Sequence, residues 1–201
     1  FSGNANGLAY NFTRTGISYQ LNRVDKWKEE KDPKFGTMRK KIDQLTIYRV
    51  DMKWINANQN LSIKKGKALP GYENYYLEHC KNGALGVKNY EDLTFINIYP
   101  GINAKWYEKQ GAMEFDLVVA PNSKPEQIKL EINGAQKLVV NDKGELVITT
   151  PLGTIIEKAP IAYQGQNTVV VKWKLNDNVA SFQLGAYDHN AELIIDPVVR
   201  L

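Results

Sequence analysis

Short segments in which apolar and polar residues alternate dominate the chain, and glycine, proline or asparagine separates most of them. Successive side chains of an extended strand point to opposite faces, so this alternation is typical of half-buried β-strands. The clearest examples follow residue 113: EFDLVVA, IKLEI, ELVITT, TVVVKWKL and ASFQLGAY. The pattern predicts an all-β protein with little helix.

Turn residues lie where the alternation is interrupted. Residues 14–16 separate LAYNFT from GISYQL, which predicts the first hairpin, and Asn-Asp-Lys-Gly at 141–144 predicts another. The long segment LTIYRVDMKWINA is a further predicted strand. Its apolar residues change parity between Ile47 and Tyr48, which indicates a bulge or burial on both faces.

Residues 24–43, VDKWKEEKDPKFGTMRKKID, are the best candidate for a helix, but the pattern is poor. Pro33 and Gly36 interrupt its middle, and its apolar residues lack a steady period of 3.6. We interpret the segment as a solvated, partly mobile excursion between two strands. A basic arm for an acidic partner is the alternative, although acidic residues interleave with the lysines.

The amino-acid composition of the sequence changes near residues 120–125. Before this point the chain is rich in tyrosine, tryptophan and asparagine, and after it the strands are short and rich in valine, isoleucine and leucine. Pro121 and Pro125 mark the change, because proline cannot donate to a strand ladder. We therefore predict two packed sandwich-like β lobes: an aromatic-rich N-terminal lobe, 1–120, and a C-terminal lobe, 121–201.

Composition excludes several classes of protein. The 201 residues carry a net charge of only +4, which does not indicate nucleic-acid binding, and no apolar run is long enough to span a membrane. A single cysteine, Cys80, excludes an internal disulfide, and two histidines exclude a multi-histidine metal centre. We expect no cofactor and assign no metal ligand, while a calcium site of carboxylates and amides stays open. The chain begins at Phe1, so we expect a processed or excised piece.

The one constellation of catalytic interest is Glu114 and Asp116, which lie beside Trp106 and Tyr107 in YPGINAKWYEKQGAMEFDLVVAPN. Strand geometry puts both carboxylates on one face, roughly 7 Å apart at their Cα atoms. Glycosidases use paired carboxyl groups at about 5–9.5 Å, so a polysaccharide hydrolase is an alternative. Any strand with a solvated face has the same spacing, and we therefore predict no catalytic residues.

Neighbouring His79 and Cys80 suggest a thiol nucleophile beside a base. Adjacent strand residues point to opposite faces and are poorly placed to share a proton. We therefore interpret Cys80 as structural or incidental.

Aromatic residues offer a second kind of site. Tyr72, Tyr75 and Tyr76 lie in and after a Pro-Gly turn, and Trp27 lies in the charged segment. Such side chains suit sugar rings or protein partners when they are exposed, although tyrosines also fill β cores. We predict these four as ligand-binding residues, and we expect Trp106 and Trp173 in the core.

Four phrases carry a resemblance to a known family: LPGYENYYLE, LTFINIYPGINAKWYEKQGAMEFDLVVAPNSKPEQIKL, GELVITTPLGTIIEKAPIAYQ and FQLGAYDHNAELIIDPVV. In their order and spacing they resemble an uncharacterised bacterial domain. It occurs near the N-terminus of large secreted and cell-surface proteins, often before β-propeller-type repeats. The resemblance also implies that residues 99–102 and 150–153 are turns shared by the family.

The resemblance implies location and architecture more than chemistry, because the family carries no established catalytic residues to transfer. It implies a secreted or cell-surface bacterial protein in which this domain packs against the following repeats. We therefore expect a non-catalytic structural or binding module whose further partner is a surface glycan or a protein.

Overall fold

The computed structural model describes residues 1–5, 8–76, 80, 82–197 and 199–200, and these are mainly β-structure. The helical structure in them is a single 3-10 turn, η1 (Pro125–Gln127). Among the same residues, no helix has the length and apolar character needed to cross a membrane. The predicted all-β class is confirmed.

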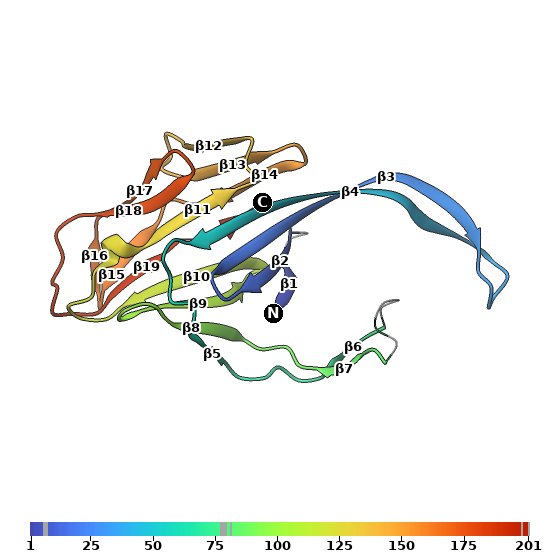
Figure 1. Cartoon of the computed structure of the whole chain (residues 1–201), viewed down its shortest axis with the longest axis horizontal. Coiled ribbons are helices and arrows are strands. Elements are labelled where there is room, and N and C mark those ends of the chain that lie inside the picture. The colour runs from blue at the N-terminus through green and yellow to red at the C-terminus, as the bar shows by residue number, and fades with distance from the viewer. Residues whose placement is uncertain (6–7, 77–79, 81, 198, 201) are drawn as a thin grey trace.

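Two seven-stranded antiparallel sheets form the body (Figure 1). The strands of the first, in spatial order, are β1 (Ser2–Ala5), β2 (Leu8–Thr13), β3 (Gly16–Lys31), β4 (Met38–Trp54), β11 (Lys129–Asn133), β18 (Val179–Leu184) and β17 (Val171–Asn176). Those of the second are β16 (Asn167–Val169), β15 (Ile161–Gln164), β19 (Leu193–Asp196), β10 (Ala112–Val119), β9 (Ile102–Lys109), β8 (Asp92–Tyr99) and β5 (Ser62–Lys65).

Two smaller sheets complete the described part of the fold. One contains β12 (Lys137–Val140), β13 (Leu146–Thr150), β14 (Gly153–Glu157) and β20 (Val199–Arg200). The other is a hairpin of β6 (Glu73–Tyr75) and β7 (Ala84–Val87).

Aromatic side chains join the two large sheets across the core. Phe12 of the first sheet meets Trp106 of the second with ring centroids 5.0 Å apart, and Trp54 meets Phe115 at 6.0 Å. Both contacts are edge-to-face, a favourable arrangement for aromatic quadrupoles. Trp106 and Trp173 are buried, which confirms their predicted place in the core.

The predicted division at residue 120 does not separate two sandwiches. β11, β17 and β18 pair within the same sheet as β1–β4, and β15, β16 and β19 pair within the same sheet as β8–β10. Strands from 1–120 and from 121–201 therefore share both sheets and one hydrophobic core. After residue 120 the chain adds strands beside β4 in the first sheet and beside β10 in the second. The composition of the sequence does not reveal this pairing.

The predicted excursion at 24–43 is solvated, but it is not a loop between two strands, because β3 and β4 continue through most of it as a paired ribbon. The connection is a tight turn in which the Asp32 carboxylate accepts hydrogen bonds from the backbone N–H groups of Lys34 and Phe35. Pro33 and Gly36, which interrupt any helix, are the residues that this turn uses; Gly36 has a φ of 70°.

The change of parity at Ile47 and Tyr48 reflects neither of the two predicted causes, a bulge or burial on both faces. Pairing is regular there, with Leu21 opposite Tyr48 and Asn22 opposite Ile47. Tyr48 packs against the core, whereas Ile47 and Leu45 are exposed on the other face of the ribbon. The strand leaves the body at this point, and the register shifts lie farther along, between Val24 and Trp27.

The other predicted turns are confirmed. Residues 14–15 connect β2 with β3, and 141–145 connect β12 with β13. Residues 99–102 join β8 to β9 through Gly101, whose φ is 74°, and 150–153 join β13 to β14. Proline followed by glycine suits the first of these two turns, because the third residue needs a positive φ.

Candidate functional site

Alternation along β10 places Glu114 and Asp116 on the face of the second sheet that points away from the core. Their neighbours Met113, Phe115 and Leu117 are buried against the first sheet, as predicted. Leu117 pairs with Ile195 of β19, so the antiparallel register brings Asp196 beside Asp116. Sheet geometry therefore explains the shared face, and it adds a third carboxyl group from a distant part of the chain.

Tyrosine and lysine side chains surround these three acids, which we call the acidic cluster: Glu114, Asp116 and Asp196. The Tyr107 hydroxyl donates a hydrogen bond to Asp116 Oδ1 at 3.0 Å. Lys109 Nζ lies 3.6 Å from Glu114 Oε2. Glu114 is only 7 % exposed, and its Oε2 atom and Asp196 Oδ1 are buried without a hydrogen-bond partner.

Burial and nearby negative charges shift the titration of Asp116 and Asp196. Burial, with the nearby charges of Asp116 and Glu114, raises the pKa of Asp196 to about 6. Burial also raises the pKa of Asp116, although the hydrogen bond from Tyr107 opposes this. The pKa of Tyr107 is raised by burial and by the charges of Asp116 and Asp196. Perturbed carboxyl groups of this kind occur both at catalytic sites and in structural networks.

The surroundings of the acidic cluster limit its chemistry. Within the described ranges, no three histidine, cysteine or acidic side chains converge so as to hold a metal ion. A surface hollow of about 530 Å³ lies elsewhere, on the first sheet, and its lining includes Lys129, Lys174 and Val179 but none of the three acids. Asp196, with a pKa of about 6, can exchange a proton near that pH, and this hollow does not place a substrate against the acidic cluster.

The predicted tyrosines lie together on the small β6–β7 hairpin, which we call the tyrosine hairpin (residues 72–76 and 82–89). Their exposed fractions are 63 % for Tyr72, 44 % for Tyr75 and 76 % for Tyr76. Lys88 Nζ lies 5.7 Å from the centre of the Tyr72 ring, and the Tyr75 hydroxyl donates a hydrogen bond to Glu73. These contacts hold two of the rings on an exposed surface.

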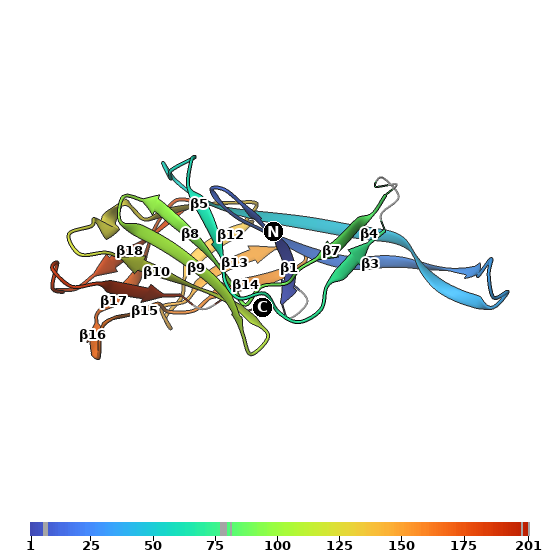
Figure 2. The ribbon, with the colours of Figure 1, turned by 90° about the horizontal axis from the view of Figure 1, so that it is seen from below.

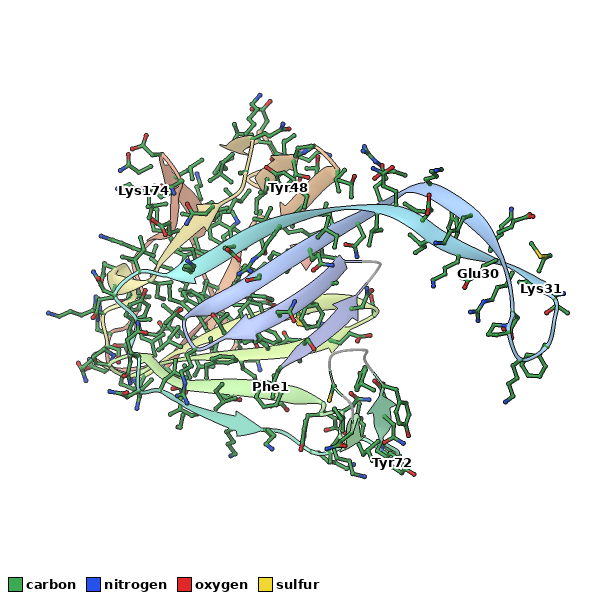
Figure 3. The ribbon with its side chains drawn as sticks, turned by 45° about the vertical axis from the view of Figure 1, so that its right-hand side comes forward. Phe1, Glu30, Lys31, Tyr48, Tyr72 and Lys174 are labelled. Carbon is green, nitrogen blue, oxygen red and sulfur yellow. The ribbon has the colours of Figure 1, made fainter. Side chains whose placement is uncertain are left out.

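Trp27 lies on the other projecting hairpin, formed by β3 and β4. It is 55 % exposed, unlike buried Trp54, Trp106 and Trp173. Both hairpins project from the same end of the body (Figure 2). Figure 3 shows Tyr72 on the tyrosine hairpin and Glu30 and Lys31 far out on the other. The structure thus groups the three tyrosines and places Trp27 on a separate element.

Comparison with known proteins adds a family. A family-wide sequence profile matches residues 1–198, nearly the whole chain. The chain belongs to the family Domain of unknown function (DUF7948). Comparisons with curated proteins and with solved structures gave no match. The membership agrees with the uncharacterised domain expected from the sequence, whereas the parent protein and its repeats stay predictions.

Glu157, at the end of β14, is a buried acid that the sequence reasoning missed. It is fully buried facing Tyr19 of β3, and neither its two carboxylate oxygens nor the Tyr19 hydroxyl has a partner of good hydrogen-bond geometry. Burial raises the pKa of Glu157 to about 8, so the group is mostly protonated at neutral pH. Alternation along the strand could have indicated its burial, because Glu157 lies two residues after buried Ile155 and so faces the same side.

Asp196 precedes Pro197, and nothing local in the sequence indicates its approach to Asp116. Cys80 is a free, half-buried thiol. His79, its proposed partner, lies outside the described residues.

Proposed function

We propose that this domain is a non-catalytic binding module of a larger secreted or cell-surface bacterial protein. In this role it packs against following repeats, and its exposed aromatic residues contact a surface glycan or a protein. The location and the repeats rest on the family resemblance in the sequence.

The observation that carries the proposal is the exposure of Tyr72, Tyr75 and Tyr76 on one small hairpin. Burying an aromatic side chain stabilises a protein substantially, so three adjacent exposed rings indicate a use for the surface. Contacts from Lys88 and Glu73 hold two of these rings, which lowers the entropy lost when a ligand binds. Rings of this kind stack well against the apolar faces of sugars and against protein side chains.

A glycan array tests the glycan form of this proposal, with a variant in which all three tyrosines are replaced by serine. We expect the wild-type domain to bind at least one bacterial surface glycan and the variant not to bind it. The control replaces exposed Ile161 and Val170 by serine. The same variants, in a pull-down with the repeats of the parent chain, test the protein form. Equal binding by wild type and the tyrosine variant in both assays contradicts the proposal.

A polysaccharide hydrolase is the second candidate, and the acidic cluster is the observation that favours it. Asp196 has a pKa of about 6 beside Asp116, a combination that suits a general acid and a general base. Reducing-end release from polysaccharides, measured for wild type and for Asp196→Asn, separates the two candidates. Hydrolysis that Asp196→Asn abolishes favours the enzyme, and no hydrolysis by wild type favours the binding module.

A further inference from the structure

The β3–β4 ribbon extends beyond every neighbouring strand. β2 pairs with β3 only as far as Gln20, and β11 pairs with β4 only from Asp51 onward. We call residues 22–47 the arm; it curves away from the body in Figure 1. A two-stranded ribbon is marginally stable in water, so the side chains that it leaves exposed need a physical reason.

The arm has one apolar face because each strand carries one extra residue. Val24 pairs with Leu45 and Trp27 pairs with Ile42, with register shifts between the two pairs. Regular alternation would put Val24 and Trp27 on opposite faces, and the bulge returns them to the same face. The residues of this apolar arm face are Val24, Trp27, Ile42, Leu45 and Ile47.

Charged residues occupy the opposite face of the arm. Lys26 and Lys28 both reach Asp43, at 3.0 and 3.7 Å. Asp25, the extra residue of β3, bonds Arg23 and Thr46. The ion pairs confirm the assignment of faces, because residues 26, 28 and 43 lie together and residues 27 and 42 lie behind them.

The apolar arm face is exposed to solvent. Trp27 is 55 % exposed, Ile47 54 % and Ile42 42 %. Farther out, Glu29, Lys31 and Lys40 share this face, because they follow Trp27 and precede Ile42 at even spacing, and Glu29 lies opposite Lys40. The surface is therefore apolar at its centre, and its outer end carries two lysines and one glutamate, a net positive charge.

The charge of the arm decides which partner fits. Eight basic and five acidic residues between 22 and 47 give a net charge of +3, most of the +4 of the whole chain. Four of the five acids already form ion pairs within the arm. A second copy would bring another +3 against this surface, and bulges and lysines also protect the open strand edges against pairing with another chain.

We propose that the apolar arm face is the docking surface for an acidic partner protein, with apolar side chains against Trp27 and Ile42 and carboxylates against Lys31 and Lys40. The inference rests on the proposed binding role of the domain, and it names a surface and a class of partner for that role.

Fluorescence anisotropy with two labelled peptides tests this inference. The probe alternates leucine and glutamate, and its charge control alternates leucine and lysine. We expect the domain to bind the glutamate peptide at low salt and not the lysine peptide. Trp27→Ser with Ile42→Thr, and separately Lys31→Glu with Lys40→Glu, should each weaken binding at least tenfold.

Matched substitutions at exposed positions elsewhere in the domain serve as controls. Ile161→Thr with Val170→Thr, and Lys137→Glu with Lys172→Glu, should leave peptide binding unchanged. Thermal unfolding confirms that all variants remain folded. Absence of glutamate-peptide binding, or equal binding by the arm variants, overturns the inference.

Two other occupants of the apolar arm face would give different results. An arm-dependent dimer in analytical ultracentrifugation would assign the face to a second copy. Arm-dependent binding to phosphatidylserine vesicles, without peptide binding, would assign it to a membrane surface. Either result overturns the inference. Glycan and repeat binding by the tyrosine variant is measured independently of the arm. A negative result for the arm therefore does not contradict the proposed function.

Discussion

Replacing Glu157 by glutamine keeps the shape of the side chain and removes its ability to ionise. The folded protein holds the Glu157 proton up to a pKa of about 8, whereas the ordinary value is 4.5. Between these two pH values the folded state binds more protons than the unfolded state, so wild-type stability falls as the pH rises. Each unit of this difference corresponds to about 1.36 kcal/mol, and the whole window to about 5 kcal/mol.

The variant does not titrate at this position, so its stability relative to wild type should increase from pH 4.5 to pH 8 and then stay constant. Urea unfolding followed by tryptophan fluorescence at pH 5, 7 and 9 measures this difference. Glu192→Gln, at an exposed position, is the matched control for the loss of one glutamate charge. A constant difference between Glu157→Gln and wild type across this range would refute the reasoning, because it would mean that Glu157 ionises normally in the folded protein.

Three further predictions concern the turn, the acidic cluster and the arm. Gly101→Ala should lower the free energy of unfolding by about 1–3 kcal/mol in urea titrations, because a φ of 74° strains a residue with a Cβ; an unchanged value contradicts the turn assignment. Asp116→Asn should lower the pKa of Asp196 in a carboxyl carbon NMR titration, since the Asp116 charge helps to raise it; an unaltered titration curve would show that the two are uncoupled. Replacing residues 23–46 by an Asn-Gly turn, which joins the paired residues Asn22 and Ile47, should change Tm by less than about 4 °C. A shortened domain that unfolds would show that the arm is needed for folding.

Local patterns in the sequence predicted the strands and turns of the body well, because alternation and turn chemistry act over a few residues. Phe115 and Trp106 are buried as the period of two requires, and Gly101 adopts the conformation that its turn needs. The arm was missed for a physical reason. Its bulges break the alternation at Val24–Trp27, and its charged positions are matched by cross-strand ion pairs such as that of Lys41 with Glu30, which depend on the register of the ribbon.

The candidate sites show the same limit. The exposure of Trp27 and the shared face of Glu114 and Asp116 follow from local pattern. The approach of Asp196 to Asp116 depends on the register between β10 and β19, which are separated by more than 70 residues. The partial burial of the acidic cluster is also more than alternation alone accounts for, since a solvated strand face would leave all three acids open.

The central claim is that the projecting hairpins bind while the sandwich body supports them. Chemical-shift mapping of the isotope-labelled domain, with a glycan or repeat that binds in the assays above and separately with the glutamate peptide, tests it most directly. We predict that the amides perturbed by the glycan or repeat cluster on the tyrosine hairpin, around Tyr72 and Tyr76, and that those perturbed by the glutamate peptide cluster on the arm, around Trp27. Perturbations centred on Asp116 and Asp196, with the hairpins unaffected, would contradict the account and identify the acidic cluster as the working site.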